Sequence, residues 1–96
     1  MKIGLTGDTH NNLKNIEIIC SIFNKEEVEL VIHTGDITLP KSLEKFSILN
    51  MPLFGVFGNN DQGDKQSLKK VCNLYSFELD DGLKKMDLNI KKIVIV

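Results

Sequence analysis

Hydrophobic residues along this chain alternate between short continuous runs and longer stretches with helical spacing. Three apolar runs, at residues 2–6, 29–34 and 53–57, are short, and each is followed at once by glycine. Runs of this length and composition are typical of strands that are buried in a sheet. We therefore predict three strands, each ending in a turn.

The stretches between and after these runs predict helices. Asn12 is a suitable N-cap for the first, a helix at about 12–26. Pro40 suits the first position of a second, short helix, and a third is expected at about 64–75. The apolar positions expected to face the core are Leu13, Ile16, Ile19, Cys20 and Phe23, then Leu43, Phe46 and Leu49, then Leu68, Val71, Cys72 and Tyr75.

Strand and helix alternating in this way predict an α/β fold, with a parallel sheet built from βαβαβα units and right-handed crossovers. Beyond residue 75 the sequence is strand material broken at Asp81-Gly82. Its last run, at 93–96, is apolar on both faces, which predicts a strand inside a sheet. Because no helix follows to cover it, we expect 1–96 to be the N-terminal part of a larger domain, truncated before its second half.

The composition argues against nucleic-acid binding and against membrane contact. The formal net charge is −1 and all twelve basic residues are lysine, so we expect no nucleic-acid patch and no arginine fork for phosphate. No apolar run approaches the ~20 residues of a membrane span, and no signal peptide is visible. These features predict a cytoplasmic protein without membrane contact. Cys20 and Cys72 lie in helical patterns, which favours two buried, reduced thiols.

Polar residues follow each predicted strand at its carboxyl end. The segments are Gly-Asp-Thr-His at 7–10, Gly-Asp at 35–36 and Gly-Asn-Asn-Asp at 58–61. Carboxyl ends of neighbouring parallel strands face one crevice, where ligands bind. Two carboxylates, an imidazole and a carboxamide form a ligand set for Mn, Zn, Fe or Mg, unlike that of a thiolate site.

The spacing of these residues predicts how they could share metal ions. Asp8 and His10 lie two apart on one turn, so both can reach the same ion. Asp36 has two carboxylate oxygens and could bridge two ions, while Asn59 offers a neutral carbonyl oxygen to the second. Taken singly, an Asp after Gly is more often a turn or cap residue, and the metal-site hypothesis rests on the residues together.

The blocks GDTH, GD and GNND, at successive strand ends, resemble the first three blocks of the calcineurin-like metallophosphoesterases, with the strongest likeness to the small prokaryotic phosphodiesterases. The resemblance covers the chain and implies a layered metallophosphoesterase fold. It also implies hydrolysis of a small phosphodiester by a metal-bound hydroxide. The cofactor would be two divalent ions, Mn²⁺ as first choice, with Ni, Zn, Fe or Mg as alternatives.

The resemblance also implies roles for individual residues. Asp8 and His10 would bind the first ion, Asp36 would bridge the pair and take part in catalysis, and Asn59 would bind the second. Asn60 occupies the catalytic position where many relatives have a leaving-group histidine, although an amide cannot act as a general acid at neutral pH. Asp61 is predicted to orient the Asn59-Asn60 turn by hydrogen bonding.

The family completes its metal sites with histidines from later blocks, which this chain does not contain. His33 lies within a strand and is predicted to be structural or close to the site without binding metal. One alternative is therefore a non-catalytic or split fragment that binds metal weakly and needs a second, C-terminal polypeptide. Homo-oligomerisation through the 93–96 strand is a further expectation. A doubly wound signalling domain would not need His10 or the GNND turn.

Overall fold

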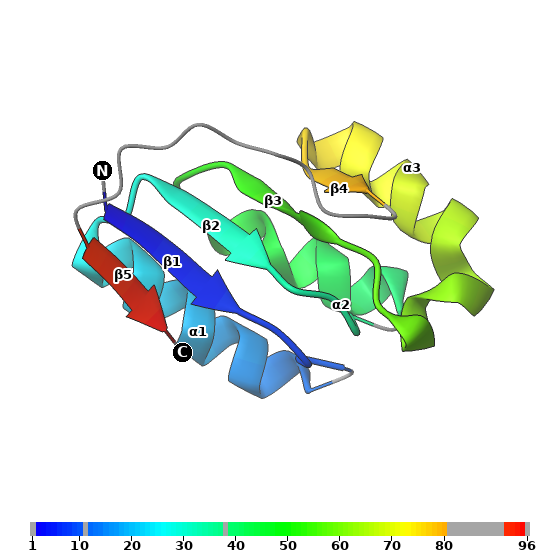
Figure 1. Cartoon of the computed structure of the whole chain (residues 1–96), viewed down its shortest axis with the longest axis horizontal. Coiled ribbons are helices and arrows are strands. Elements are labelled where there is room, and N and C mark those ends of the chain that lie inside the picture. Colours follow the sequence, from blue (N-terminus) through cyan, green and yellow to red (C-terminus); the bar gives the residue numbers. More distant parts are fainter. Residues whose placement is uncertain (1, 11, 38, 81–91, 96) are drawn as a thin grey trace.

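The structure, a computed structural model, describes residues 2–10, 12–37, 39–80 and 92–95, apart from the side chains of Asn59, Asn60 and Asp64. In this part of the chain, strands and helices alternate and pack in two layers (Figure 1). The elements are β1 (Lys2–Thr6), α1 (Leu13–Glu26), β2 (Leu30–His33), α2 (Pro40–Lys45), the 3-10 helix η1 (Phe46–Ile48), β3 (Leu53–Val56), the 3-10 helix η2 (Asn59–Asp64), α3 (Lys65–Tyr75), β4 (Glu78–Asp80) and β5 (Lys92–Ile95).

The described strands form one sheet with the order β4-β3-β2-β1-β5, and every neighbouring pair is parallel. This confirms the predicted α/β class and parallel sheet. All the carboxyl ends of the strands therefore lie at the same end of the sheet. β1 and β2, which carry the first two predicted site blocks, are direct neighbours in register, with Thr6 opposite His33.

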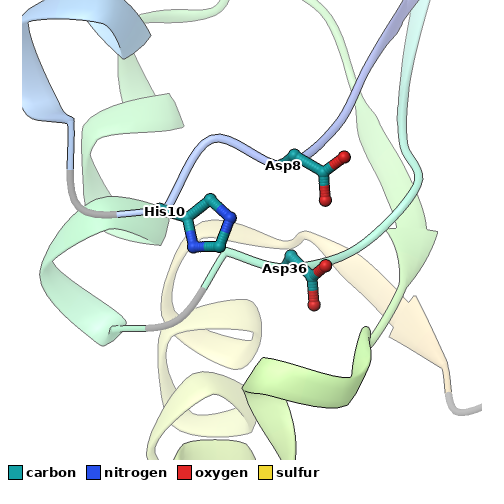
Figure 2. Close-up of side chains that lie close together, drawn as sticks. All are labelled: Asp8, His10 and Asp36. Atoms are coloured by element: carbon teal, nitrogen blue, oxygen red, sulfur yellow. The ribbon is translucent and has the colours of Figure 1, made fainter.

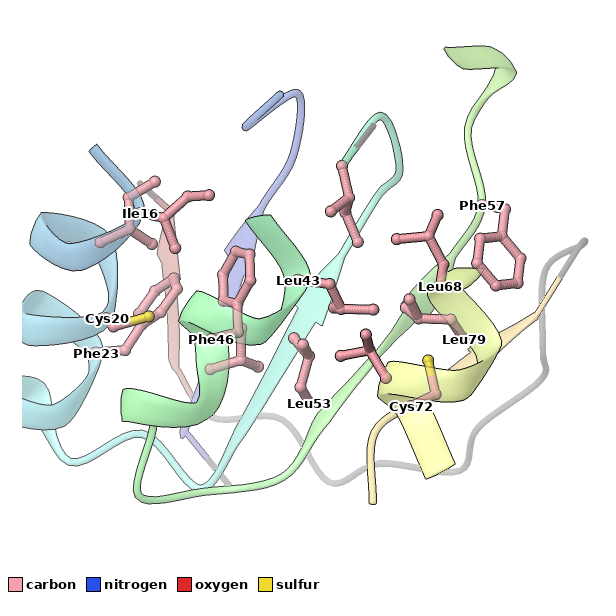
Figure 3. Packing of buried hydrophobic residues seen from close by; sticks show 14 of the residues in the cluster. Ile16, Cys20, Phe23, Leu43, Phe46, Leu53, Phe57, Leu68, Cys72 and Leu79 are labelled. Atoms are coloured by element: carbon pink, nitrogen blue, oxygen red, sulfur yellow. The ribbon is translucent and has the colours of Figure 1, made fainter. Parts of the chain in front are cut away.

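The hydrophobic core lies between one face of the sheet and the helices (Figure 3). Residues of α1, α2 and α3 belong to the same buried cluster as Val31, Leu53 and Leu79 of the strands. Gly4 allows α1 to approach, because a Cβ there would lie 2.6 Å from the Phe23 ring. The amphipathic faces predicted from spacing are buried with a few exceptions, and Tyr75 remains 40% exposed.

The helix boundaries agree with the predicted signals at most places. Asn12 caps α1, since its side chain accepts a hydrogen bond of 3.0 Å from the Asn15 amide. Pro40 is the first residue of α2, as predicted. The second helical stretch is less regular than expected, because the α-helix ends at Lys45 and continues as η1. The third helix is preceded by η2, so the chain coils tightly within the third site block itself.

The last strand differs from the prediction. β5 was expected inside a sheet, but in the described sheet it is the terminal strand and pairs with β1. Val94 packs against the core between the sheet and the helices, so Ile93 and Ile95, which alternate with it along the strand, point to the other face and are 49% and 74% exposed. A two-sided apolar pattern therefore did not indicate two-sided burial here. The predicted break at Asp81-Gly82 lies outside the described residues.

Two smaller expectations concern cysteines and membranes. Cys20 and Cys72 are free and buried, as predicted, and burial raises the pKa of the Cys20 thiol to about 12. Among the helices that the structure describes, none has the length and hydrophobicity needed to cross a membrane.

Candidate metal centre

The loops after β1 and β2 continue the parallel pairing of their strands. The Thr34 amide donates to the Thr6 carbonyl at 2.9 Å, at the point where the two strands end. Beyond it, the Asp8 amide donates to the Gly35 carbonyl at 3.0 Å, and the His10 amide donates to the Asp36 carbonyl at 3.0 Å. The first two site blocks are thus held side by side by their own backbone.

This pairing brings three predicted site residues together (Figure 2). One ligand atom from each of Asp8, His10 and Asp36 lies within 4.8 Å of the other two. Asp8 and His10 are exposed and Asp36 is partly buried, so the cluster is open to solvent on one side. Two carboxylates and an imidazole at this spacing fit a hard or borderline divalent ion.

The backbone at the three residues has an uncommon conformation. The φ angle is +51° at Asp8, +47° at His10 and +63° at Asp36. This left-handed region costs a non-glycine residue roughly 1–2 kcal/mol, although Asp and His tolerate it better than most. Sequence reasoning did not predict this feature. Strained residues cluster at functional sites, where the surrounding structure holds them in place.

Glycines let the second and third loops approach each other. Gly35 has a φ of +113°, and a Cβ there would lie 2.8 Å from the Gly58 backbone nitrogen. At Gly58 itself, a Cβ would lie 2.2 Å from an oxygen of the Asp36 carboxylate. The Asp36 side chain therefore packs directly against the backbone of the third block, which explains why both blocks begin with glycine.

Asp61 connects the second and third blocks through its buried side chain. Its side chain is fully buried, and Oδ2 accepts hydrogen bonds from the Asp36 amide at 2.9 Å and the Gly58 amide at 2.8 Å. A carboxylate that accepts two amide hydrogen bonds is a strong, charge-assisted anchor. It fixes the backbone of Asp36 and the start of the turn that contains Asn59 and Asn60.

Asn59 and Asn60 are placed only by their backbone. They open η2, directly after the loop that follows β3. Their side chains lie outside the described part of the structure, so metal binding by Asn59 and the catalytic position of Asn60 stay predictions. The backbone does bring this turn beside Asp36, through the contact between Gly35 and Gly58.

His33 is fully buried beneath the first two loops and contacts both. Its Nδ1 accepts a hydrogen bond of 2.9 Å from the Gly35 amide, and its Nε2 lies 2.9 Å from the Thr9 hydroxyl. Burial lowers the pKa of His33 to about 4, against the opposing effect of Asp61 and Asp36. Protonation therefore opposes folding, so this contribution to stability is fully present above pH 6.5 and is lost as the pH falls through 4.

Comparison with known proteins identifies the family. The chain is 38% identical to a phosphodiesterase of Methanocaldococcus jannaschii, in an alignment covering 84% of this chain and 54% of the relative. It also superposes, with a TM-score of 0.81 and 34% identity, on a structure described as a novel archaeal phosphodiesterase, covering 91% of this chain and 53% of that one. The chain thus spans about half the length of these relatives.

A family model gives the same result over almost the whole chain. The match covers residues 1–92, which includes all three glycine-containing blocks and every described helix. The chain belongs to the calcineurin-like phosphoesterase superfamily.

Proposed function

We propose that this chain provides the first half of the active site of a metal-dependent phosphodiesterase. The observation that carries the proposal is the cluster of Asp8, His10 and Asp36, whose ligand atoms lie within 4.8 Å of one another. Members of the superfamily generally bind divalent metal ions. The named relatives are phosphodiesterases, which supports a phosphodiester as the substrate class.

The residues of the chain have separate tasks in this proposal. Asp8 and His10 would hold one ion from the first loop, Asn59 would hold a second from the third loop, and the Asp36 carboxylate would contribute to both. When bound, such an ion pair lowers the pKa of water to ~7 and stabilises the attacking and leaving oxygens. We favour Mn²⁺, with Ni, Zn, Fe and Mg as alternatives.

Asn60 limits how the leaving group is protonated. An amide carries no proton that it can release at neutral pH, so Asn60 can position the leaving oxygen but cannot act as its acid. Substrates with good leaving groups, or those protonated by water, would react fastest. The rate of hydrolysis should therefore not fall at high pH through deprotonation of residue 60, which a pH profile of activity would show.

The alternative proposal is a half-site that needs a second polypeptide. Two observations support it: the chain spans about half of its relatives, and Ile93 and Ile95 of β5 are exposed on the sheet face opposite the helices. A polypeptide that covers this face could bring further histidine ligands. In that case the chain alone would bind metal without catalysing hydrolysis.

The test is hydrolysis of a chromogenic phosphodiester by the purified chain with Mn²⁺, beside the variant Asp36→Asn. We expect Asp36→Asn to lower the Mn²⁺-dependent rate by at least ~10-fold, because it removes a charged ligand. Glu29→Gln, at an exposed carboxylate directly before β2 and so at the opposite end of the sheet, serves as the control and should keep the parent rate. A parent no faster than Asp36→Asn, in the presence of measurable Mn²⁺ binding, would favour the half-site alternative.

A further inference from the structure

His33 is a polar residue in the core that the proposed chemistry does not use. It is the last residue of β2 and is fully buried, with the Phe46 ring edge-on at 5.5 Å between centroids. Each of its ring nitrogens has a partner in a different loop of the candidate metal centre. Both partners are next to predicted ligands in the sequence: Thr9 lies between Asp8 and His10, and Gly35 precedes Asp36.

These contacts define the tautomer of the imidazole. The Gly35 N–H can only donate, so Nδ1 must carry a lone pair and cannot carry a proton. The proton of the neutral ring is therefore on Nε2, which donates to the Thr9 hydroxyl at 2.9 Å. With both nitrogens engaged and the ring buried, His33 has no atom left to bind an ion.

We propose that His33 is a positioning residue, whose imidazole joins the Asp8–His10 loop to the Asp36 loop and sets the spacing of the three ligands. This role rests on the proposed metal function of the three residues. Its physical basis is that the ligand residues occupy left-handed backbone conformations, which need support from their surroundings. Part of this support comes from the backbone hydrogen bonds between the two loops. The rest comes from the hydrogen bonds of the His33 ring to Thr9 and Gly35.

The two hydrogen bonds can be removed separately. His33→Asn keeps an acceptor close to the Nδ1 position and loses the bond to Thr9. Thr9→Val removes the same bond from the other side and keeps the shape of the buried Thr9 side chain. His33→Phe keeps a ring and loses both bonds. Leu53→Ala, at a fully buried residue at the start of β3, is the control for general destabilisation.

The readout is Mn²⁺ affinity by calorimetry, together with the free energy of unfolding of each variant. We expect affinity to fall by ~10–100-fold in His33→Phe and by less in His33→Asn and Thr9→Val, as for other residues that orient ligands. Combining His33→Asn with Thr9→Val should lower the affinity little further, because both variants remove the same hydrogen bond, the one between His33 and Thr9. Leu53→Ala should lose stability but keep the parent affinity in its folded state.

A spectroscopic measurement tests the tautomer independently of metal. In the ¹⁵N-labelled chain, the His33 ring nitrogens should show the neutral Nε2–H form from pH 8 down to ~5, in keeping with its lowered pKa. An Nδ1–H form or a protonated ring at neutral pH would overturn the proposed contacts.

The outcomes separate the two proposals. A parent chain that binds no Mn²⁺ overturns the metal function and, with it, the positioning role. A parent that binds Mn²⁺, with His33→Phe, His33→Asn and Thr9→Val all binding equally well, overturns only the role of His33. Leu53→Ala weakening binding as much as His33→Phe would also overturn it, since the effect would then be general destabilisation.

Discussion

Replacing Asp8 and Asp36 together by asparagine is expected to weaken Mn²⁺ binding by more than ~100-fold. The double variant removes two negative charges from a cluster whose ligand atoms lie within 4.8 Å of one another. Asparagine is preferred over alanine here because, like aspartate, it tolerates the left-handed φ of these positions. Loss of affinity would then report loss of the negative charge of the two ligands and not a rearranged loop.

The measurement is a calorimetric Mn²⁺ titration, with thermal unfolding of each variant as a check on folding. The control is a double variant with the same change of charge at exposed carboxylates away from the carboxyl ends of the strands, Glu29→Gln with Glu44→Gln. It should bind Mn²⁺ like the parent. Tight binding that survives Asp8→Asn with Asp36→Asn would contradict the assignment of these residues as ligands.

Replacing Asp61 by alanine should have the largest effect on stability, lowering the free energy of unfolding by about 3–5 kcal/mol. Its carboxylate is fully buried and accepts the amides of Asp36 and Gly58, each a hydrogen bond to a charged group worth about 1.5–3 kcal/mol. In the alanine variant these amides lose that acceptor. Since small domains have about 5–15 kcal/mol in total, much of the stability would be lost.

Urea unfolding of the parent, Asp61→Ala and Asp61→Asn measures this effect. Asp61→Asn keeps an oxygen acceptor without the charge, so its free energy of unfolding should lie between the other two. Asp80→Ala, an exposed carboxylate, should change it by no more than about 0.5 kcal/mol. If the free energy of unfolding of Asp61→Ala lay within about 1 kcal/mol of that of the parent, Asp61 would not anchor the two loops.

The strands and the gathering of the site residues were predictable from sequence because both depend on local pattern and on topology. Short apolar runs followed by glycine predicted the strands that lead to the site. Parallel pairing of these strands then placed Asp8, His10 and Asp36 at one end of the sheet. No detail of packing was needed for that step. It follows from strand direction alone.

Other features depend on contacts that a single sequence does not display. The exposure of Ile95 is set by its place on the sheet face opposite the helices, which an apolar run cannot indicate. The left-handed backbone at the three ligands arises from pairing between two loops that lie far apart in sequence. The two partners of His33 come from the same pairing, so its tautomer could not be predicted from residue type.

In the proposed centre, the loops after β1 and β2 share one metal ion. Paramagnetic broadening of amide NMR signals by substoichiometric Mn²⁺ locates such an ion, because broadening falls steeply with distance from it. We expect the amide signals of Asp8, His10 and Asp36 to broaden first and together, and Asp8→Asn with Asp36→Asn to abolish the effect. Broadening centred on other acidic residues, or on only one of the two loops, would contradict it.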